Sequence, residues 1–171
     1  PLVTDLTAVT SPQSTTVEKQ NLKKLSDVEK IGVLSAVLIF GQSVLGGVVR
    51  HTGAGLVCPD VPLCFGEWIP PLEAVSVITH FTHRLLGIIV LISLIVLAYK
   101  SFDLQRGSQI RTFAMTAAVL GVFQVILGFL SVYSLLAIIP VSLHTLIAAT
   151  LLSCTTYLVS LSWRERLILE N

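Results

Sequence analysis

The chain has 171 residues, of which 53% are hydrophobic and only 12% are charged, and its mean hydropathy is +0.85. In soluble domains about a quarter of all residues are charged. This composition therefore excludes a soluble globular protein and indicates a multi-pass membrane protein in contact with lipid. The formal net charge is +1 and no basic patch is present, so no nucleic-acid partner is predicted.

Four apolar stretches are long enough to cross a bilayer, which takes about 20 residues in a helix. The predicted fold class is therefore all-α, an integral membrane four-helix bundle over residues 31–163 with an outer loop over 52–73. The four predicted spans are Ile31–Val49, Val75–Tyr99, Phe113–Val132 and Leu135–Leu161.

Polar segments flank the predicted bundle. Residues 1–30 combine a flexible tail, Pro1–Gln20, with a short amphipathic segment, Leu22–Lys30, that suits the inner membrane surface. Residues 164–171 form a second tail. No cleavable signal peptide is predicted, because the first apolar run follows about thirty polar residues and is long enough to span.

The basic residues predict the orientation of the chain. Nine of the eleven Lys and Arg lie before the first span, around the loop between the second and third spans, or after the fourth. The positive-inside rule makes these regions cytoplasmic, so both termini face the cytoplasm of a prokaryotic cell and the 52–73 loop faces outward. Only Arg50 and Arg84 fall at outer helix ends.

The first span carries Gln42 and Gly46, one helical turn apart, which form a small polar stripe suited to close helix packing or to a flat ligand. The outer loop that follows is dense in Gly and Pro, which predicts a stiff, folded cap. Cys58 and Cys64 lie in this loop on the oxidising side. A structural disulfide and a redox-active pair both fit them, whereas Cys154 in the fourth span is expected to be an inert core thiol.

The second span opens with His80-Phe-Thr-His83-Arg84. Two histidines three residues apart share one helical face, and ionisable groups inside a membrane cost several kcal/mol. Two interpretations stay open at this point: a ligand-binding pair, or interfacial histidines hydrogen-bonded to a neighbouring helix.

The third and fourth spans repeat the first two. Gln124-Val-Ile-Leu-Gly128 matches Gln42-Ser-Val-Leu-Gly46, and His144 in the fourth span corresponds to His83 in the second. The bundle is therefore predicted to consist of two repeated helix pairs, related by an axis along the membrane normal.

Two neutral imidazoles that enter a bundle from alternate helices suit axial ligation of haem iron. His83 and His144 are the predicted iron ligands, and Gln42 and Gln124 are further predicted cofactor-binding residues. Arg50 and Arg84 would meet the haem propionates at the outer edge. Small residues would leave room for the flat macrocycle: Gly46, Gly87, Gly128 and Ala148.

The segment GGVVRHTGAGLVCPDVPLCFG, followed by IPP and HFTHRLLG, resembles the haem A synthase family. The resemblance is dense over Gly46–Gly87 and looser at His144. It implies a membrane oxidoreductase that oxidises the C8 methyl of haem O, its substrate, to a formyl group, giving haem A, with haem b as the iron cofactor. It also implies that this chain corresponds to one four-helix half of most members, which have eight spans.

Residue by residue, the resemblance makes His83 and His144 axial ligands, Cys58 and Cys64 the outer-loop pair, and Arg50 part of the motif beside the haem. One departure concerns His80, which stands where the family usually has a glutamate thought to take part in the oxidation. His80 is accordingly a candidate catalytic residue, together with Cys58 and Cys64. A neutral imidazole acts as a base or ligand but does not supply the negative charge of a carboxylate.

Two other functions fit the same residues. One is a haem-binding electron-transfer protein or haem chaperone, and the other is a quinone-linked enzyme that forms disulfides through Cys58 and Cys64. The resemblance to a fused pair of halves predicts a homo-oligomer, either a dimer or a trimer, because closed symmetry is the usual arrangement of identical chains. A haem O synthase and an electron donor are further expected partners.

Overall fold

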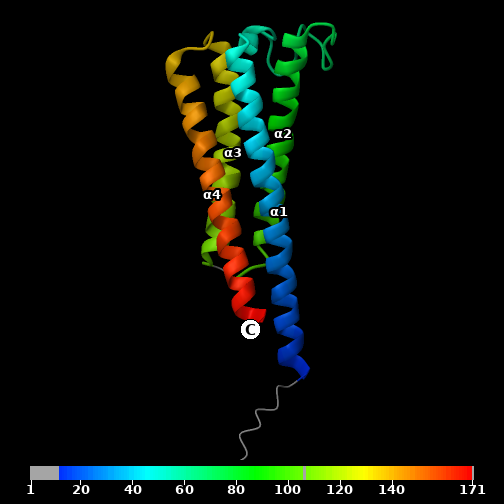
Figure 1. The fold of residues 1–171 in the computed structure, drawn as a ribbon, viewed down its shortest axis with the longest axis vertical. Helices are drawn as coiled ribbons and strands as arrows, with labels where there is room; N and C mark the ends of the chain where they lie inside the picture. Colours follow the sequence, from blue (N-terminus) through cyan, green and yellow to red (C-terminus); the bar gives the residue numbers. More distant parts are fainter. Residues whose placement is uncertain (1–11, 106, 171) are drawn as a thin grey trace, which may run out of the picture.

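The computed structural model describes residues 12–105 and 107–170, and its four long helices run along one axis (Figure 1). Each helix packs mainly against two neighbours, in the cyclic order α1, α2, α3, α4. Both ends of the described chain and the α2–α3 connection lie at one end of the bundle, and the α1–α2 and α3–α4 connections lie at the other. The elements are α1 (Pro12–His51), the short 3-10 helix η1 (Ala54–Leu56), α2 (Val75–Ser101), α3 (Gln109–Tyr133) and α4 (Ile138–Glu170).

All four long helices are long and apolar enough to cross a membrane. Their outward-facing surfaces carry large exposed hydrophobic side chains, such as Phe40, Ile92 and Phe123, which suit contact with lipid. The predicted class, an all-α membrane four-helix bundle, is confirmed. The second and third spans match their helices to within a few residues, whereas the first and fourth helices extend beyond the predicted spans.

Helix α1 corrects the predicted N-terminal segment. Over residues 12–20 helix replaces the predicted flexible tail, and Leu22–Lys30 continues the same helix rather than forming a separate surface segment; residues 1–11 lie outside the described part. One buried stripe explains the continuity, because its members recur at three- and four-residue steps on one helical face. It consists of Leu25, Val28, Gly32, Ser35 and Ile39.

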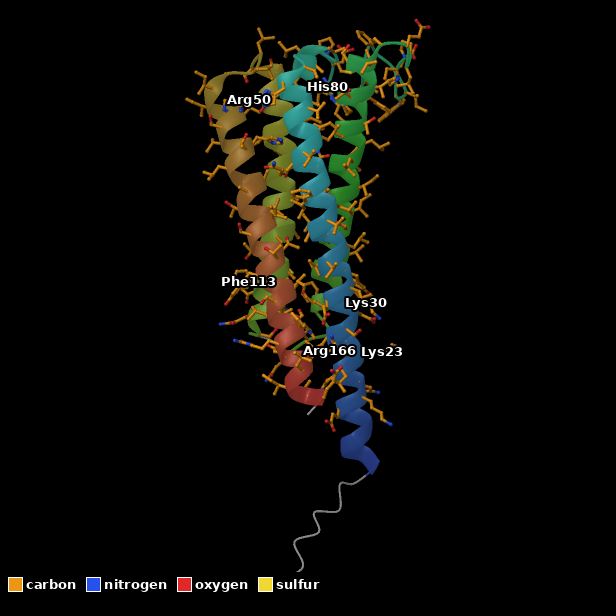
Figure 2. The ribbon with its side chains drawn as sticks, viewed as in Figure 1. Lys23, Lys30, Arg50, His80, Phe113 and Arg166 are labelled. Carbon is orange, nitrogen blue, oxygen red and sulfur yellow. A yellow bond between two sulfur atoms is a disulfide. The ribbon has the colours of Figure 1, made fainter. Side chains whose placement is uncertain are left out.

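Helix α4 likewise continues through the predicted C-terminal tail to Glu170. Arg166 on this extension pairs with Glu29 of α1 at 2.9 Å and with Glu170 one turn further on at 2.8 Å. At 1.5 Å per residue, the 40-residue α1 is about 60 Å long, roughly twice the hydrocarbon thickness. The two helices therefore extend the bundle beyond the membrane at this end, where Figure 2 shows Lys23, Lys30 and Arg166.

The tightly packed apolar core lies in the half of the bundle that contains the termini. It includes Leu94, Leu97, Ile110, Leu151 and Leu158, each at most 2% exposed. The polar side chains predicted to form a site lie in the other half, where Figure 2 labels Arg50 and His80. The half that contains the termini therefore holds the helices together, while the opposite half holds the polar groups.

Candidate functional site

The repeat inferred from the sequence is also present in three dimensions. In the first helix pair, Gln42 Nε2 donates to the backbone carbonyl of His83 at 2.9 Å; in the second, Gln124 Nε2 donates to the carbonyl of His144 at 2.9 Å. His83 lies eight residues into α2 and His144 six residues into α4, about 12 and 9 Å along the helix axes. Each pair therefore presents one histidine at similar depth, with its backbone tied to a glutamine of the preceding helix.

Each imidazole packs against a glycine of the same preceding helix. A Cβ atom on Gly46 would lie 3.0 Å from Cε1 of His83, and one on Gly128 would lie 3.2 Å from Cε1 of His144. Both distances are shorter than ordinary van der Waals contact, so any side chain larger than hydrogen would displace the ring. The conserved spacing of Gln and Gly within each repeat unit is thus explained by one shared function, holding the histidine.

The small residues were predicted to leave room for a flat macrocycle, but the structure gives three of them another role. Gly46 and Gly128 make room for the histidine rings, and a Cβ atom on Gly87 would lie 3.1 Å from Nε2 of Gln42. Gly87 therefore allows the Gln42 amide to reach across to α2. The glycines shape the histidine and glutamine contacts, which the sequence pattern alone did not indicate.

The two imidazoles differ in their own hydrogen bonds. Nδ1 of His144 lies 3.1 Å from the carbonyl oxygen of Gln124, and a carbonyl only accepts, so Nδ1 carries the proton and Nε2 keeps its lone pair. Nε2 of His83 instead lies 3.5 Å from the amide nitrogen of Gln42, which only donates.

The buried polar atoms around the histidines fit a bound prosthetic group. Gln42 Oε1, Gln124 Oε1 and His83 Nδ1 are buried without a hydrogen-bond partner, an arrangement that is costly unless a ligand or water satisfies it. Across residues 12–105 and 107–170, no group of three or more His, Cys, Asp and Glu side chains converges on a metal position. Two histidines are enough for haem, because the porphyrin supplies the other four iron ligands.

The outer loop forms a folded cap, as predicted. Cys58 and Cys64 form a disulfide and are almost fully buried, and the loop is closed further by two backbone hydrogen bonds between Cys64 and Glu67 and by the Gly66 amide, which donates to Asp60 Oδ2 at 2.8 Å. Cys154 is a free, buried thiol in α4. The disulfide itself fits both a structural and a redox role.

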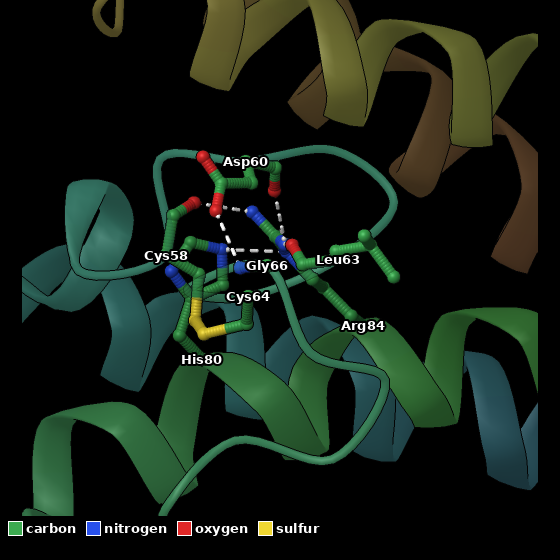
Figure 3. Close-up of a disulfide and its surroundings, with 7 residues drawn as sticks. All are labelled: Cys58, Asp60, Leu63, Cys64, Gly66, His80 and Arg84. Atoms are coloured by element: carbon green, nitrogen blue, oxygen red, sulfur yellow. Dashed lines mark hydrogen bonds between the residues drawn. A yellow bond between two sulfur atoms is a disulfide. The ribbon is translucent and has the colours of Figure 1, made fainter.

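Arg84 holds this cap to α2 (Figure 3). Its guanidinium donates to the backbone carbonyls of Asp60 and Leu63, both at 2.7 Å, and of Cys58 at 2.6 Å. Hydrogen bonds from a charged donor are among the strongest in proteins. The sequence assigned Arg84 to a haem propionate; in the structure these donors are directed to loop carbonyls, so the propionate role stays a prediction.

His80 completes the Arg84 contact. Arg84 Nε donates to Nε2 of His80 at 3.1 Å, the His80 side chain is 4% exposed, and its Nδ1 is buried without a hydrogen-bond partner. Because arginine has no acceptor, Nε2 of His80 is unprotonated and occupied. His80 thus lies one helical turn from His83 on α2 and contacts Arg84 beneath the disulfide cap (Figure 3), and its catalytic role stays a prediction.

Arg50 lies on the last turn of α1 and is exposed. Within the part of the chain that the structure describes, its side chain makes no hydrogen bond or ion pair, so it is free to meet a charged group at the outer surface. The structure thus brings together Gln42, His83, Gln124 and His144, and separately Cys58, Cys64, His80 and Arg84. The hydrogen bonds of Arg84 to the loop had one signal in the sequence, which is an arginine directly after His83 and close to a proline-rich loop.

Comparison with known proteins agrees with this architecture. Residues 3–156 match the COX15-CtaA model, described as cytochrome oxidase assembly protein. The chain is 32% identical over 142 residues to a heme A synthase of Halalkalibacterium halodurans, covering 80% of this chain and 47% of that protein. It is 34% identical over 110 residues to a heme A synthase of Symbiobacterium thermophilum, covering 64% of this chain and 36% of that protein.

The matched region therefore spans less than half of the length of each of these relatives. The family model covers most of the chain, including α2, α3, the disulfide loop and the part of α4 that carries His144. The chain is a multi-pass membrane protein, and it belongs to the family of cytochrome oxidase assembly proteins that contains the haem A synthases.

Proposed function

We propose that this protein is a membrane haem oxidoreductase of the haem A synthase type, which oxidises the C8 methyl of haem O to a formyl group. The observation that carries the proposal is the paired arrangement of His83 and His144, each seated on a glycine and tied by a glutamine at similar depth. Membership of the family supports the substrate class. Haem b bound between the two histidines would supply the one-electron and oxygen chemistry that protein side chains lack.

The chain's own residues position and enclose the reacting groups. His83 and His144 would hold the iron through Nε2, and Gln42 and Gln124 fix their helical backbones through the 2.9 Å bonds to the carbonyls. The unpartnered Oε1 atoms of the two glutamines are acceptors within the same buried layer. Arg50, exposed and positively charged at the outer end of α1, is the candidate partner of a propionate.

The disulfide cap closes the outer end of the site in this proposal. Arg84, the residue directly after His83, holds the loop through its hydrogen bonds, and His80 orients Arg84. In the predicted orientation the cap faces outward and both termini face the cytoplasm, because the basic side chains Lys23, Lys30 and Arg166 lie at the opposite end from the cap (Figure 2). Cys58 and Cys64 are proposed to be a redox-active pair, which an external dithiol reduces by thiol–disulfide exchange while becoming a disulfide itself.

A homo-oligomer, a dimer or a trimer, is part of the proposal, together with an electron donor and a haem O synthase that delivers substrate. The exposed apolar faces of α1 and α4 provide surface for association between copies within the membrane. Native mass spectrometry in mild detergent measures the number of copies, and an active haem-loaded monomer would refute this part.

The decisive experiment is co-production of the protein with a haem O synthase in a host that makes no haem A, followed by extraction and mass spectrometry of the haems. A formyl haem is the expected product. The matched control is the His144→Ala variant, which should accumulate haem O. Haem bound to the unsubstituted protein without any formyl product would refute the oxidation.

A haem carrier or electron-transfer protein is the second candidate, and one observation favours it. His80 occupies the position of the family glutamate and is engaged with Arg84, so the negative charge supplied by a carboxylate there is missing. In this case the extraction experiment would yield stoichiometric haem b and no formyl haem. A His80→Glu variant that gained formyl product would then show which side chain was lacking.

A further inference from the structure

The two candidate iron ligands are held alike in three respects. Each lies on the second helix of its pair, each backbone carbonyl accepts a 2.9 Å hydrogen bond from a glutamine, and each ring rests on a glycine. Against these shared features, the contacts of the ring nitrogens are a clear difference between His83 and His144.

The ring of His144 is arranged as a metal ligand before any metal is bound. Its Nδ1 donates to the Gln124 carbonyl at 3.1 Å, which fixes the ring orientation and leaves Nε2 unprotonated. Metal-ligating histidines usually donate their second nitrogen to a carbonyl or carboxylate in this way, and the bond raises the basicity of the ligating nitrogen.

The ring of His83 lacks this support. Its Nδ1 is buried without a partner, and its Nε2 lies 3.5 Å from the Gln42 amide nitrogen. The 2.9 Å bond from that same nitrogen to the His83 carbonyl identifies it as a donor, so one of its N–H groups is directed toward the lone pair that would bind iron. At 3.5 Å this hydrogen bond is weak, so iron can displace the Gln42 amide from Nε2 of His83. When the bond between His83 and iron breaks, the amide competes with iron for Nε2.

We propose that His144 would be the firmly held iron ligand and that His83 would be the ligand more easily displaced, which would open a coordination position. This inference rests on haem binding as part of the proposed function. A released His83 is stabilised by the Gln42 amide, whereas a released His144 would gain no comparable partner for Nε2 among the described contacts. The opened position accepts a small diatomic ligand, for which carbon monoxide is the probe.

The test uses full-length protein purified without haem and reconstituted with haem b. His83→Ala should retain haem with an affinity within about threefold of the unsubstituted protein, whereas His144→Ala should lose at least about tenfold, the scale on which ligand support changes metal affinity. Added imidazole should restore the low-spin spectrum of His83→Ala. Equal losses in the two variants, or a larger loss in His83→Ala, would overturn the assignment.

A second pair of variants keeps both histidines. Gln42→Met removes the competing donor, so His83 should stay bound longer and the rate of carbon monoxide binding to ferrous protein should fall about tenfold. Ser43→Ala is the control on the same helix, because the Ser43 hydroxyl bonds only the Ile39 carbonyl of α1, so its rate should change by less than about twofold. Equal rates in the two variants would refute the inequivalence.

Failure of the inference and failure of the proposed function give different results. If the unsubstituted protein takes up no haem b, the proposed function and the inference both fall. If it takes up haem b and makes no formyl haem, but the variants differ as expected, the oxidation is refuted and the unequal ligation stands.

Discussion

The two helix pairs of the bundle share their glutamine, glycine and histidine positions but differ in how their helices are joined at the outer end. Residues 52–74 join α1 to α2 through a disulfide-closed cap, whereas residues 134–137 join α3 to α4 through a short turn. In that turn Leu135 and Leu136 adopt positive φ values of 53° and 62°, which L residues with large side chains rarely do.

The difference shows that a sequence repeat can keep the backbone geometry of a site while its surroundings diverge. In the first pair, the histidine helix is tied through Arg84 to the cap; in the second, the histidine ring is tied through Nδ1 to Gln124. The cap and the turn also meet, because Leu136 packs 3.2 Å from where a Cβ of Gly55 would lie. Each half therefore anchors its histidine by a different route.

The largest effect is expected at the histidines. Replacing either His83 or His144 by Ala should abolish the six-coordinate low-spin haem spectrum, because bis-histidine ligation needs both rings. His51→Ala is the control: His51 is the last residue of α1 and is exposed, so its loss should leave the spectrum intact. Optical and electron paramagnetic resonance spectra of the haem-loaded proteins provide the measurement, and low-spin haem in both intramembrane variants would show that the repeat is not a ligand pair.

The disulfide should stabilise only the first half. Replacing both Cys58 and Cys64 by Ser removes a loop-closing bond with a sequence separation of 6, which by chain entropy contributes about 2–3 kcal/mol. The free energy of unfolding, measured by SDS titration, should fall by about this amount, while low-spin haem is retained because the glutamine bonds that hold His83 and His144 do not involve the loop. Cys154→Ser, a change at the free thiol in α4, is the control in the second half, and an equal loss there would contradict the comparison.

The hydrogen bonds between Arg84 and the loop are expected to control how easily the cap opens. Arg84→Met keeps the apolar part of the side chain but removes the bonds to three loop carbonyls and to His80. Local opening should become easier, and the disulfide should be reduced at least about tenfold faster by a soluble dithiol, which corresponds to about 1.4 kcal/mol. Mass spectrometry after thiol alkylation gives the rate.

Two further variants sharpen the Arg84 result. Arg50→Met removes an exposed arginine at the same end of the bundle and should leave the reduction rate unchanged. Arg84→Lys retains the charge without the planar guanidinium that contacts several carbonyls at once, so it should restore only part of the protection. Full protection in Arg84→Lys would mean that charge, not geometry, holds the cap.

The smallest effect is expected at Gly46 and Gly128, the glycines that pack against the histidine rings. Gly46→Ala places a methyl group 3.0 Å from the His83 ring, and Gly128→Ala places one 3.2 Å from the His144 ring. Each should cost about 1 kcal/mol of unfolding free energy through overpacking and should broaden the low-spin signal by tilting the ring. Gly41→Ala, where no atom lies within 4 Å, should be neutral or stabilising, so a similar cost there would point to a general helix effect.

Much of the candidate site followed from the sequence because its signals are local. The Gln-x-x-x-Gly pairs and the histidines of alternate spans predicted a repeat, and the hydrogen bonds of Gln42 and Gln124 confirm it. The tail prediction failed over residues 12–20 because polar composition argued for disorder. The buried stripe that begins at Leu25 continues into the span and holds the helix together across the membrane boundary.

The sequence by itself determined the four apolar helices, the disulfide-competent cap and the paired histidines, since hydropathy, proline content and helical spacing are properties of neighbouring residues. Only the tertiary structure decided what Arg84 and the imidazoles bond to. The acceptors of Arg84 are backbone carbonyls 21 to 26 residues away, and the support of His144 is a backbone carbonyl 20 residues away. Every residue carries such a carbonyl, so no side-chain pattern marks which one is used until the helices pack.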